Sequence, residues 1–269
     1  MGVDAPELEG FERSSFTAMG SEYPVYRAGT GPAVIVVHEV PGITPLVAGF
    51  GRKVADAGLT AVLPSLFGTP GKPMTAGYAA KVVAQCCISR EFATLAMGRT
   101  SPITMWLRKL AAAEHERCGG PGVGAVGMCM TGGFALAMMV DPVVKAPVLS
   151  QPSLPFPLGA KRKAAVGLSD ADFEAVKERV AEGTCVLGLR FTDDMAVRPE
   201  RFATLKRELG DGFIAVEIDS SPDNPYGIPK RAHSVLTQDL VDQPGHPTRQ
   251  ALDQVLAFFR ERLGIAPAA

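Results

Sequence analysis

Short apolar segments alternate with longer segments of helical periodicity along most of the chain, and this alternation constrains the fold most strongly. AVIVVHEV (33–40) and GVGAVGM (122–128) are bounded by Gly and Pro, as buried strands usually are. SPITMWLRKLAAAEHERCGG (101–120) and PTRQALDQVLAFFRERLG (247–264) have the apolar spacing and the end signals of helices. Strands and helices that alternate through short connections predict an α/β fold with a doubly wound, mostly parallel sheet and helices on both faces.

The remaining elements follow the same two patterns. Further strands are predicted at 60–68, 145–152, 184–192 and 213–220, further helices at 44–59, 132–141, 169–183 and 198–210, and an edge hairpin at 15–29. Residues 64–100 interrupt the alternation with a long connection that starts rich in Pro and Gly, and we expect an insertion or a lid there. We expect residues 1–269 to form a single domain, since no linker divides them.

Composition and charge favour a small-molecule partner. The chain has 269 residues, 46% of them hydrophobic, and a net charge of −1, which gives no electrostatic case for nucleic acid or an anionic membrane. It has no run of about 18 apolar residues that could span a bilayer. An acidic N-terminus without an apolar region, together with five cysteines that share no pair spacing, predicts a cytoplasmic protein with reduced thiols and no metal site.

The segment GMCMTGG (127–133) joins a predicted strand to a predicted helix. A nucleophile elbow needs small residues around a sharp turn, and Gly127, Gly132 and Gly133 supply them around Cys129. The N-terminus of a helix lowers the pKa of a thiol and offers backbone N–H groups to an oxyanion. The alternative is a buried structural cysteine in a glycine-rich bend.

A nucleophile needs a base, and the base needs an orienting acid. His233 lies in a loop after the predicted strand at 213–220, and Asp193 and Asp194 follow the predicted strand at 184–192. Nucleophile, acid and base therefore come in the chain order of α/β-hydrolases.

Four segments together resemble the dienelactone hydrolase family, the cysteine branch of the α/β-hydrolases. They are VVHEVPG after the first core strand, GMCMTGG at the elbow, DDMAV and AHSVL, and the resemblance runs from about residue 14 to about residue 262. Its specific part is the pairing of a glutamate before a turn with a cysteine elbow. The resemblance implies an α/β-hydrolase fold and the hydrolysis of a small ester or lactone through a thioester acyl-enzyme, without a metal or organic cofactor.

The resemblance assigns roles to individual residues. Cys129 matches the nucleophile, His233 the base and Asp194 the acid, with Asp193 a near alternative. Glu39 matches the carboxylate beside the thiol, which holds or accepts the cysteine proton; a salt-bridged structural glutamate is the alternative.

Two neighbours of these residues complete the predicted site. The backbone N–H groups of Val40 and Met130 match the oxyanion hole of the family. His38 would point to the face opposite Glu39 in an extended strand, so we expect it to be packed rather than reactive.

Two positions depart from the family pattern, and a third is a weak match to it. Thr131 stands where the family usually has glycine, and would tighten the turn or add a hydroxyl near the site. Thr237 stands where dienelactone-specific members have an arginine that grips the substrate carboxylate, and Arg90 is a weak candidate for a second such arginine, equally suited to a surface role.

The sequence therefore predicts a carboxylic-ester hydrolase, as a monomer or homodimer. Two alternatives stay open: a thioesterase or acyl-transfer enzyme on the same triad, and a non-catalytic binding or sensor protein whose thiol responds to ligand or oxidant.

Overall fold

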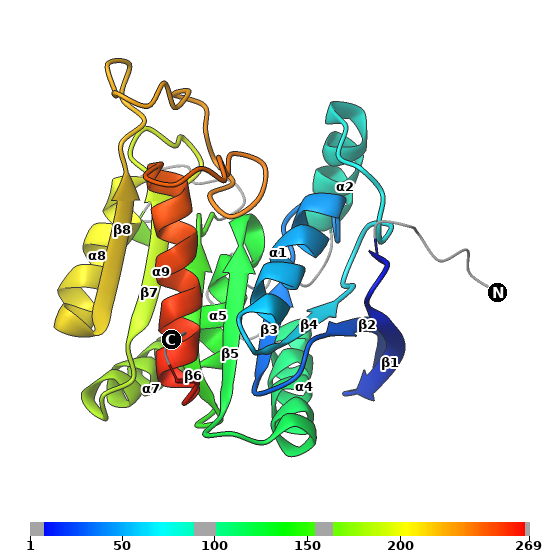
Figure 1. Cartoon of the computed structure of the whole chain (residues 1–269). Coiled ribbons are helices and arrows are strands. Elements are labelled where there is room, and N and C mark those ends of the chain that lie inside the picture. Colours follow the sequence, from blue (N-terminus) through cyan, green and yellow to red (C-terminus); the bar gives the residue numbers. More distant parts are fainter. Residues whose placement is uncertain (1–7, 89–100, 154–163, 267–269) are drawn as a thin grey trace.

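The computed structural model describes residues 8–88, 101–153 and 164–266 (Figure 1). The strands are β1 (Glu12–Ala18), β2 (Ser21–Ala28), β3 (Ala33–Val37), β4 (Thr60–Pro64), β5 (Val123–Met128), β6 (Val144–Ser150), β7 (Val186–Phe191) and β8 (Phe213–Ile218). The helices are α1 (Pro45–Asp56), α2 (Ala76–Ile88), α4 (Pro102–Cys118), α5 (Gly132–Met138), α7 (Asp170–Ala181), α8 (Pro199–Leu209) and α9 (Pro247–Arg262), and two 3-10 turns are η2 (Cys129–Thr131) and η3 (Gly210–Gly212).

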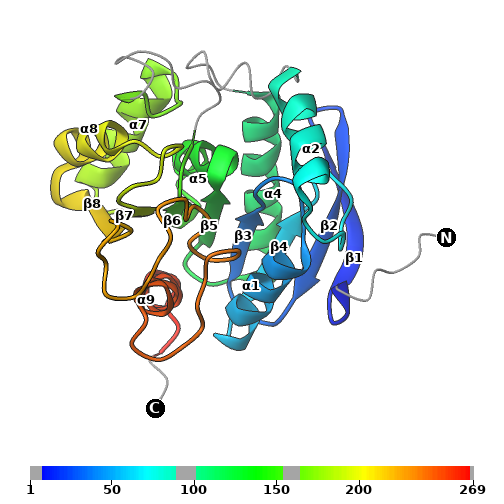
Figure 2. The same cartoon turned by 90° about the horizontal axis from the view of Figure 1, so that it is seen from above.

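The eight strands form one sheet in the order β1-β2-β4-β3-β5-β6-β7-β8. β2 pairs antiparallel with β1 and β4, and all other neighbours are parallel. The carboxyl ends of β3 and of β5 to β8 therefore meet at one edge of the sheet, and Figure 2 looks down onto that edge. This topology confirms the mostly parallel sheet and the N-terminal hairpin that the sequence predicts.

Helices cover both faces of the sheet. α1 and α9 lie on one face, and α4, α5, α7 and α8 lie on the other (Figure 2). In β3, Ile35 and Val37 pack toward the α4 and α5 side while Val34 and Val36 pack toward α1 and α9, because successive strand residues point to opposite faces. The buried strands thus read as continuous apolar runs.

β3 is shorter than the segment 33–40 predicts. It ends at Val37, which pairs with Gly127 near the end of β5. Beyond this point β5 turns into the η2 segment, and the Val37 carbonyl accepts a hydrogen bond from the Thr131 hydroxyl at 2.8 Å. The described residues offer the ladder no partner further on, so residues 38–40 lie outside the strand.

The connection at 64–100 contains α2, a helix that the sequence reading leaves out. Its residue Val82 is 2% exposed and packs in the core on the α4 side. Residues 89–100 and the side chains of Cys86 and Cys87 lie outside the described residues, so a covering role for this segment stays a prediction.

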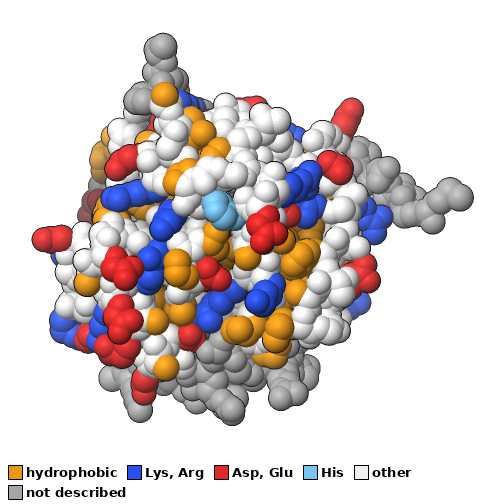
Figure 3. All heavy atoms as spheres, turned by 90° about the horizontal axis from the view of Figure 1, so that it is seen from below, with side chains coloured by type: hydrophobic (Ala, Val, Ile, Leu, Met, Phe, Trp, Pro, Cys, Tyr) orange, Lys and Arg blue, Asp and Glu red, His pale blue; other side chains and the backbone are white. Residues whose placement is uncertain are grey.

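Figure 3 shows the side opposite Figure 2, where the strands begin. Lys and Arg side chains lie there among Asp and Glu side chains and small apolar patches, as the net charge of −1 leads one to expect. None of the helices in the described ranges combines the length and the apolar character that a membrane span needs.

Candidate active site

Cys129 lies on a sharp turn between β5 and α5. Its φ of +57° places a non-glycine residue in the left-handed region, which side chains rarely adopt outside functional turns. The turn is crowded: a Cβ at Gly127 would collide with the Thr131 carbonyl, and a Cβ at Gly132 would lie 2.6 Å from the Cβ of Pro152. The small residues of GMCMTGG are therefore required by close backbone packing, as in a nucleophile elbow.

Thr131, the departure from the family pattern, fastens this turn. Its buried Oγ1 accepts a hydrogen bond from Met128 N–H at 2.9 Å. The same oxygen lies 2.8 Å from the carbonyl oxygens of Val37 and of Met128, either of which accepts its proton. Of the two effects foreseen for this hydroxyl, the structure shows the tightening of the turn.

His233 pairs with Asp194 rather than with Asp193. The His233 Nδ1 is 2.6 Å from Asp194 Oδ2, and the buried Asp194 also accepts the N–H of Ala196 at 2.8 Å. The Asp193 carboxylate is 3.8 Å from the amino group of Lys230, near the surface. Two acids follow β7, and the geometry selects the second as the partner of the histidine.

His233 also hydrogen-bonds to the thiol of Cys129. Burial by itself lowers the pKa of His233, but the hydrogen bonds to Asp194 and Cys129, together with the negative charges of both groups, outweigh burial and hold this pKa well above its usual value. The three side chains therefore form one connected chain of donors and acceptors, and this environment favours the protonated imidazole.

Glu39 is held by three neutral donors. Its carboxylate, 7% exposed, accepts hydrogen bonds from Gln151 Nε2 at 3.1 Å, from Ser234 Oγ at 2.7 Å and from Thr237 Oγ1. Within the ranges that the structure describes, the partners of this carboxylate include neither the Cys129 thiol nor a cationic side chain. Glu39 thus joins the end of β3 to the loop that carries His233, without the salt bridge of the structural alternative.

His38 is packed, as its place in the sequence predicts. It is fully buried, and burial lowers its pKa to about 4. Its Nε2 accepts the N–H of Leu66 at 3.1 Å, which places the ring proton on Nδ1, 3.0 Å from the Glu39 carbonyl. The ring also lies edge-on to Phe67, with centroids 4.4 Å apart. The neutral ring serves packing rather than proton transfer.

The two predicted oxyanion donors lie in different parts of the chain, Met130 directly after Cys129 and Val40 after β3. Met130 is the second residue of η2, where backbone N–H groups have no partner inside the helix. Val40 lies in the turn after β3, which the Gly42 N–H closes onto the Glu39 carbonyl at 2.8 Å. Their binding of an oxyanion stays a prediction, and Arg90 lies outside the described residues.

Sequence reasoning misses three residues around this site. The Ser153 hydroxyl lies 3.3 Å from the Cys129 sulfur. The Asp239 carboxylate accepts the backbone N–H groups of His233 at 2.8 Å and of Ser234 at 2.9 Å, and so fixes the histidine loop. Gln151 reaches Glu39 from the end of β6. The available signal is position alone, since Gln151 and Ser153 follow the strand next to β5, where sheets of this type bind ligands.

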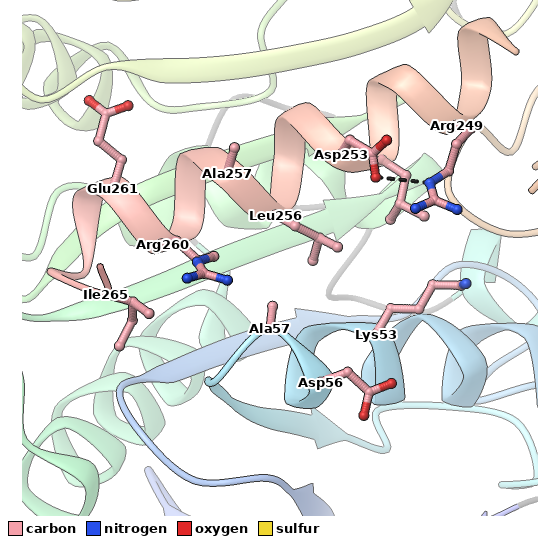
Figure 4. Close-up of a pocket in the computed structure, with 11 residues that line it drawn as sticks. Lys53, Asp56, Ala57, Arg249, Asp253, Leu256, Ala257, Arg260, Glu261 and Ile265 are labelled. Carbon is pink, nitrogen blue, oxygen red and sulfur yellow. Dashed lines mark hydrogen bonds and ion pairs between the residues drawn. The ribbon is translucent and has the colours of Figure 1, made fainter. Parts of the chain in front are cut away.

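A groove between α1 and α9 is a separate feature of the surface. It encloses about 960 Å³, and its lining includes Ala57, Leu256 and Ile265 together with charged side chains such as Lys53 and Arg249 (Figure 4). None of the four predicted catalytic side chains lines it. In the described segments there is also no group of three or more His, Cys, Asp or Glu side chains arranged to hold a metal ion.

The sequence model of the Dienelactone hydrolase family matches residues 23–182. The chain belongs to the dienelactone hydrolase family. The matched region runs from β2 to the end of α7 and includes Glu39 and Cys129, whereas Asp194 and His233 lie beyond it. Membership supports an ester-hydrolysing enzyme in general. No curated protein matches the sequence.

Several solved structures of other proteins have a fold similar to that of this member of the dienelactone hydrolase family. A proposed dienelactone hydrolase from Klebsiella pneumoniae is 18% identical, with a TM-score of 0.65 over 93% of this chain and 98% of that one. The dienelactone hydrolase-like promiscuous phosphotriesterase P91 from metagenomic libraries is 18% identical, with a TM-score of 0.61 over 94% and 98%. Est1E from Butyrivibrio proteoclasticus is 12% identical, with a TM-score of 0.52 over 94% and 99%. The predicted α/β-hydrolase fold is thereby confirmed.

Proposed function

We propose that the protein hydrolyses small carboxylic esters or lactones with a triad of Cys129, His233 and Asp194, through a thioester acyl-enzyme. The observation that carries this proposal is the chain of contacts on the elbow: the His233 Nδ1 lies 2.6 Å from Asp194, and the same ring hydrogen-bonds to the Cys129 thiol. A nucleophile, a base and an orienting acid in contact are the machinery of acyl transfer.

Acylation begins when the Cys129 thiolate attacks the substrate carbonyl. The carbonyl oxygen becomes an oxyanion, for which the N–H groups of Val40 and Met130 are the proposed donors. When the tetrahedral intermediate collapses, the bond to the alcohol oxygen breaks and the His233 imidazolium protonates the departing alkoxide. A thioester on Cys129 and a neutral imidazole remain.

Deacylation uses the same groups in reverse. Neutral His233 takes a proton from water, and the hydroxide attacks the thioester carbonyl. The second tetrahedral intermediate expels the Cys129 thiolate and releases the carboxylic acid. Asp194 stays ionised throughout and orients the ring, since its carboxylate holds the proton-bearing Nδ1.

Hydrolysis of p-nitrophenyl acetate and of a small enol-lactone tests this function. We expect Cys129→Ala and His233→Ala to lower kcat by about 10³-fold or more, because each removes a member of a unit. Cys185→Ala and His246→Ala are the matched controls, since Cys185 lies beside β7 and His246 caps α9. Wild-type rates in both triad variants would remove the triad from the mechanism.

The intermediate is tested separately. Rapid quenching of the wild type with p-nitrophenyl acetate, followed by peptide mass spectrometry, is expected to place an acetyl group on Cys129. Acyl thioesters assayed beside the oxygen esters distinguish the thioesterase alternative, which predicts the higher kcat/KM for the thioester. A thiol-based sensor would turn over neither substrate.

A further inference from the structure

We propose that Ser153 is a further catalytic residue of this site, whose hydroxyl donates a hydrogen bond to the ionised sulfur of Cys129. The Ser153 Oγ lies 3.3 Å from the Cys129 Sγ, within the range for a hydrogen bond to sulfur, and the serine is 5% exposed. The inference rests on the proposed function, since it assigns a second donor to the same nucleophile.

A hydrogen bond between the two backbones supports the contact between the two side chains. The Ser153 N–H donates to the Cys129 carbonyl at 2.9 Å, so the two residues are joined by main chain as well as by side chain. Pro152 packs against Gly132, where a Cβ would lie 2.6 Å from the proline ring. The turn after β6 therefore packs directly against the elbow, and these contacts fix the position of Ser153 relative to Cys129.

Gln151 fixes the start of this turn. Its N–H donates to the Leu189 carbonyl of β7 at 2.8 Å, and its φ of +37° is a strained value for a side chain that is fully buried. The strain redirects the chain from β6 across the elbow instead of away from it. A non-glycine residue in this conformation indicates that the surrounding contacts determine the turn.

Arg201 holds the same turn from α8. Its guanidinium is 3% exposed and donates from Nε to the Ala165 carbonyl at 2.7 Å and from Nη1 to the Pro152 carbonyl. Burial lowers the pKa of Arg201 to about 10. Arg201 is a positioning residue in this arrangement, since it acts on the residue before Ser153 and does not touch the sulfur.

The chemistry of the sulfur explains what the hydroxyl adds. The sulfur already has a hydrogen bond with His233, and a second donor stabilises the thiolate further relative to the thiol. In the thioester the sulfur is a poor acceptor, so the Ser153 bond weakens on acylation and strengthens again as the thiolate departs. The hydroxyl therefore favours the thiolate over the thiol, and with it the collapse of the second intermediate.

The test follows alkylation of Cys129 by iodoacetamide against pH, read at the Cys129 peptide by mass spectrometry. Because only the thiolate reacts, the pH midpoint reports its stability without requiring turnover. We expect Ser153→Ala to move the midpoint up by roughly one pH unit, which corresponds to about a tenfold loss of thiolate. Ser153→Thr, which keeps the hydroxyl, is expected to retain the wild-type midpoint, as is the control Ser15→Ala on the exposed strand β1.

Two outcomes would overturn the proposal. One is a Ser153→Ala midpoint equal to that of the wild type. The other is an equal shift in Ser153→Thr with unchanged thermal melting, which would attribute the shift to something other than the hydroxyl. Failure of the proposed function appears elsewhere, as ester hydrolysis that survives Cys129→Ala, so the two failures are distinguishable.

Discussion

The Thr237 hydroxyl donates a hydrogen bond to the Glu39 carboxylate, although 198 positions separate them in the chain. The resemblance to dienelactone hydrolases implies an arginine at the position of Thr237. Here a neutral donor takes that place, and Ser234 and Gln151 supply the other two hydrogen bonds to the carboxylate. Glu39 is thus satisfied by uncharged groups, and its role in binding the histidine loop to the end of β3 does not depend on a cation.

Thr237→Val tests this role, since it keeps the shape and removes the donor. A hydrogen bond to a buried charge contributes about 1.5 to 3 kcal/mol, so we expect the free energy of unfolding to fall by about that amount in a urea titration. Thr237→Ser keeps the hydroxyl and should cost less than about 1 kcal/mol. An equal loss in both variants would show that the hydrogen bond from this hydroxyl to Glu39 is not what stabilises the fold.

The two acids after β7 should behave differently. Asp194→Asn removes the charge that orients the His233 ring, and we expect kcat for p-nitrophenyl acetate to fall on the order of 10³- to 10⁴-fold. Asp193→Asn removes only a 3.8 Å contact with an exposed lysine, and we expect a change of less than about twofold. A large loss in Asp193→Asn with activity retained in Asp194→Asn would reverse the assignment.

His38 predicts a loss of stability in acid. Its folded-state pKa of about 4 lies below the unfolded value of 6.5, so its contribution is complete above pH 6.5 and declines as pH falls toward 4, where the unfolded chain takes up the proton first. Between about pH 7 and pH 5 this amounts to about 2 kcal/mol. Urea unfolding of wild type and His38→Gln at both pH values should show the difference narrowing in acid; a constant difference would contradict the low pKa.

The sequence points to Cys129, Asp194 and His233 because each comes after a strand of the sheet, although His233 lies well along the loop that follows β8. Cys129, Asp194 and His233 follow β5, β7 and β8, and parallel strands bring their carboxyl ends together whatever the loops do. Ser153 and Arg201 depend instead on how the turn after β6 crosses the elbow, which involves a positive φ at Gln151 that no local pattern indicates. The segment 33–40 extends past the observed end of β3 because a tertiary contact, the hydrogen bond from the Thr131 hydroxyl to the Val37 carbonyl, stands where its ladder ends.

The sequence does not predict the helix α2, and the reason is different. It lies in a connection rich in Pro and Gly at its start, and Val82 is buried while its neighbours Val83, Ala84 and Gln85 are exposed. A helix that buries so little of its described surface leaves a weak periodic signal. Tertiary contact with the core decides its formation.

Arg201 should affect catalysis more than its distance in sequence suggests. Arg201→Met removes the donors to Pro152 and Ala165 and leaves both carbonyls unsatisfied, which costs about 1 to 3 kcal/mol of unfolding free energy in urea. Because the turn that carries Ser153 loosens, we also expect kcat to fall about tenfold with KM little changed. Arg207→Met, whose guanidinium is exposed on the same helix, is the control. Stability loss with wild-type kcat would limit Arg201 to a structural role.

Two glycine substitutions, one at the elbow and one in α1, are expected to change the free energy of unfolding in opposite directions. Gly132→Ala places a methyl group 2.6 Å from the Pro152 ring, and because Pro152 is backbone-fixed we expect overpacking to cost about 1 to 3 kcal/mol in urea unfolding. Gly49→Ala in α1 meets nothing within 4 Å, so it should stabilise the protein by about 0.5 to 1 kcal/mol, since alanine favours a helix. If Gly132→Ala left the free energy of unfolding unchanged or raised it, close packing of α5 against the turn after β6 would not be what excludes a side chain at position 132.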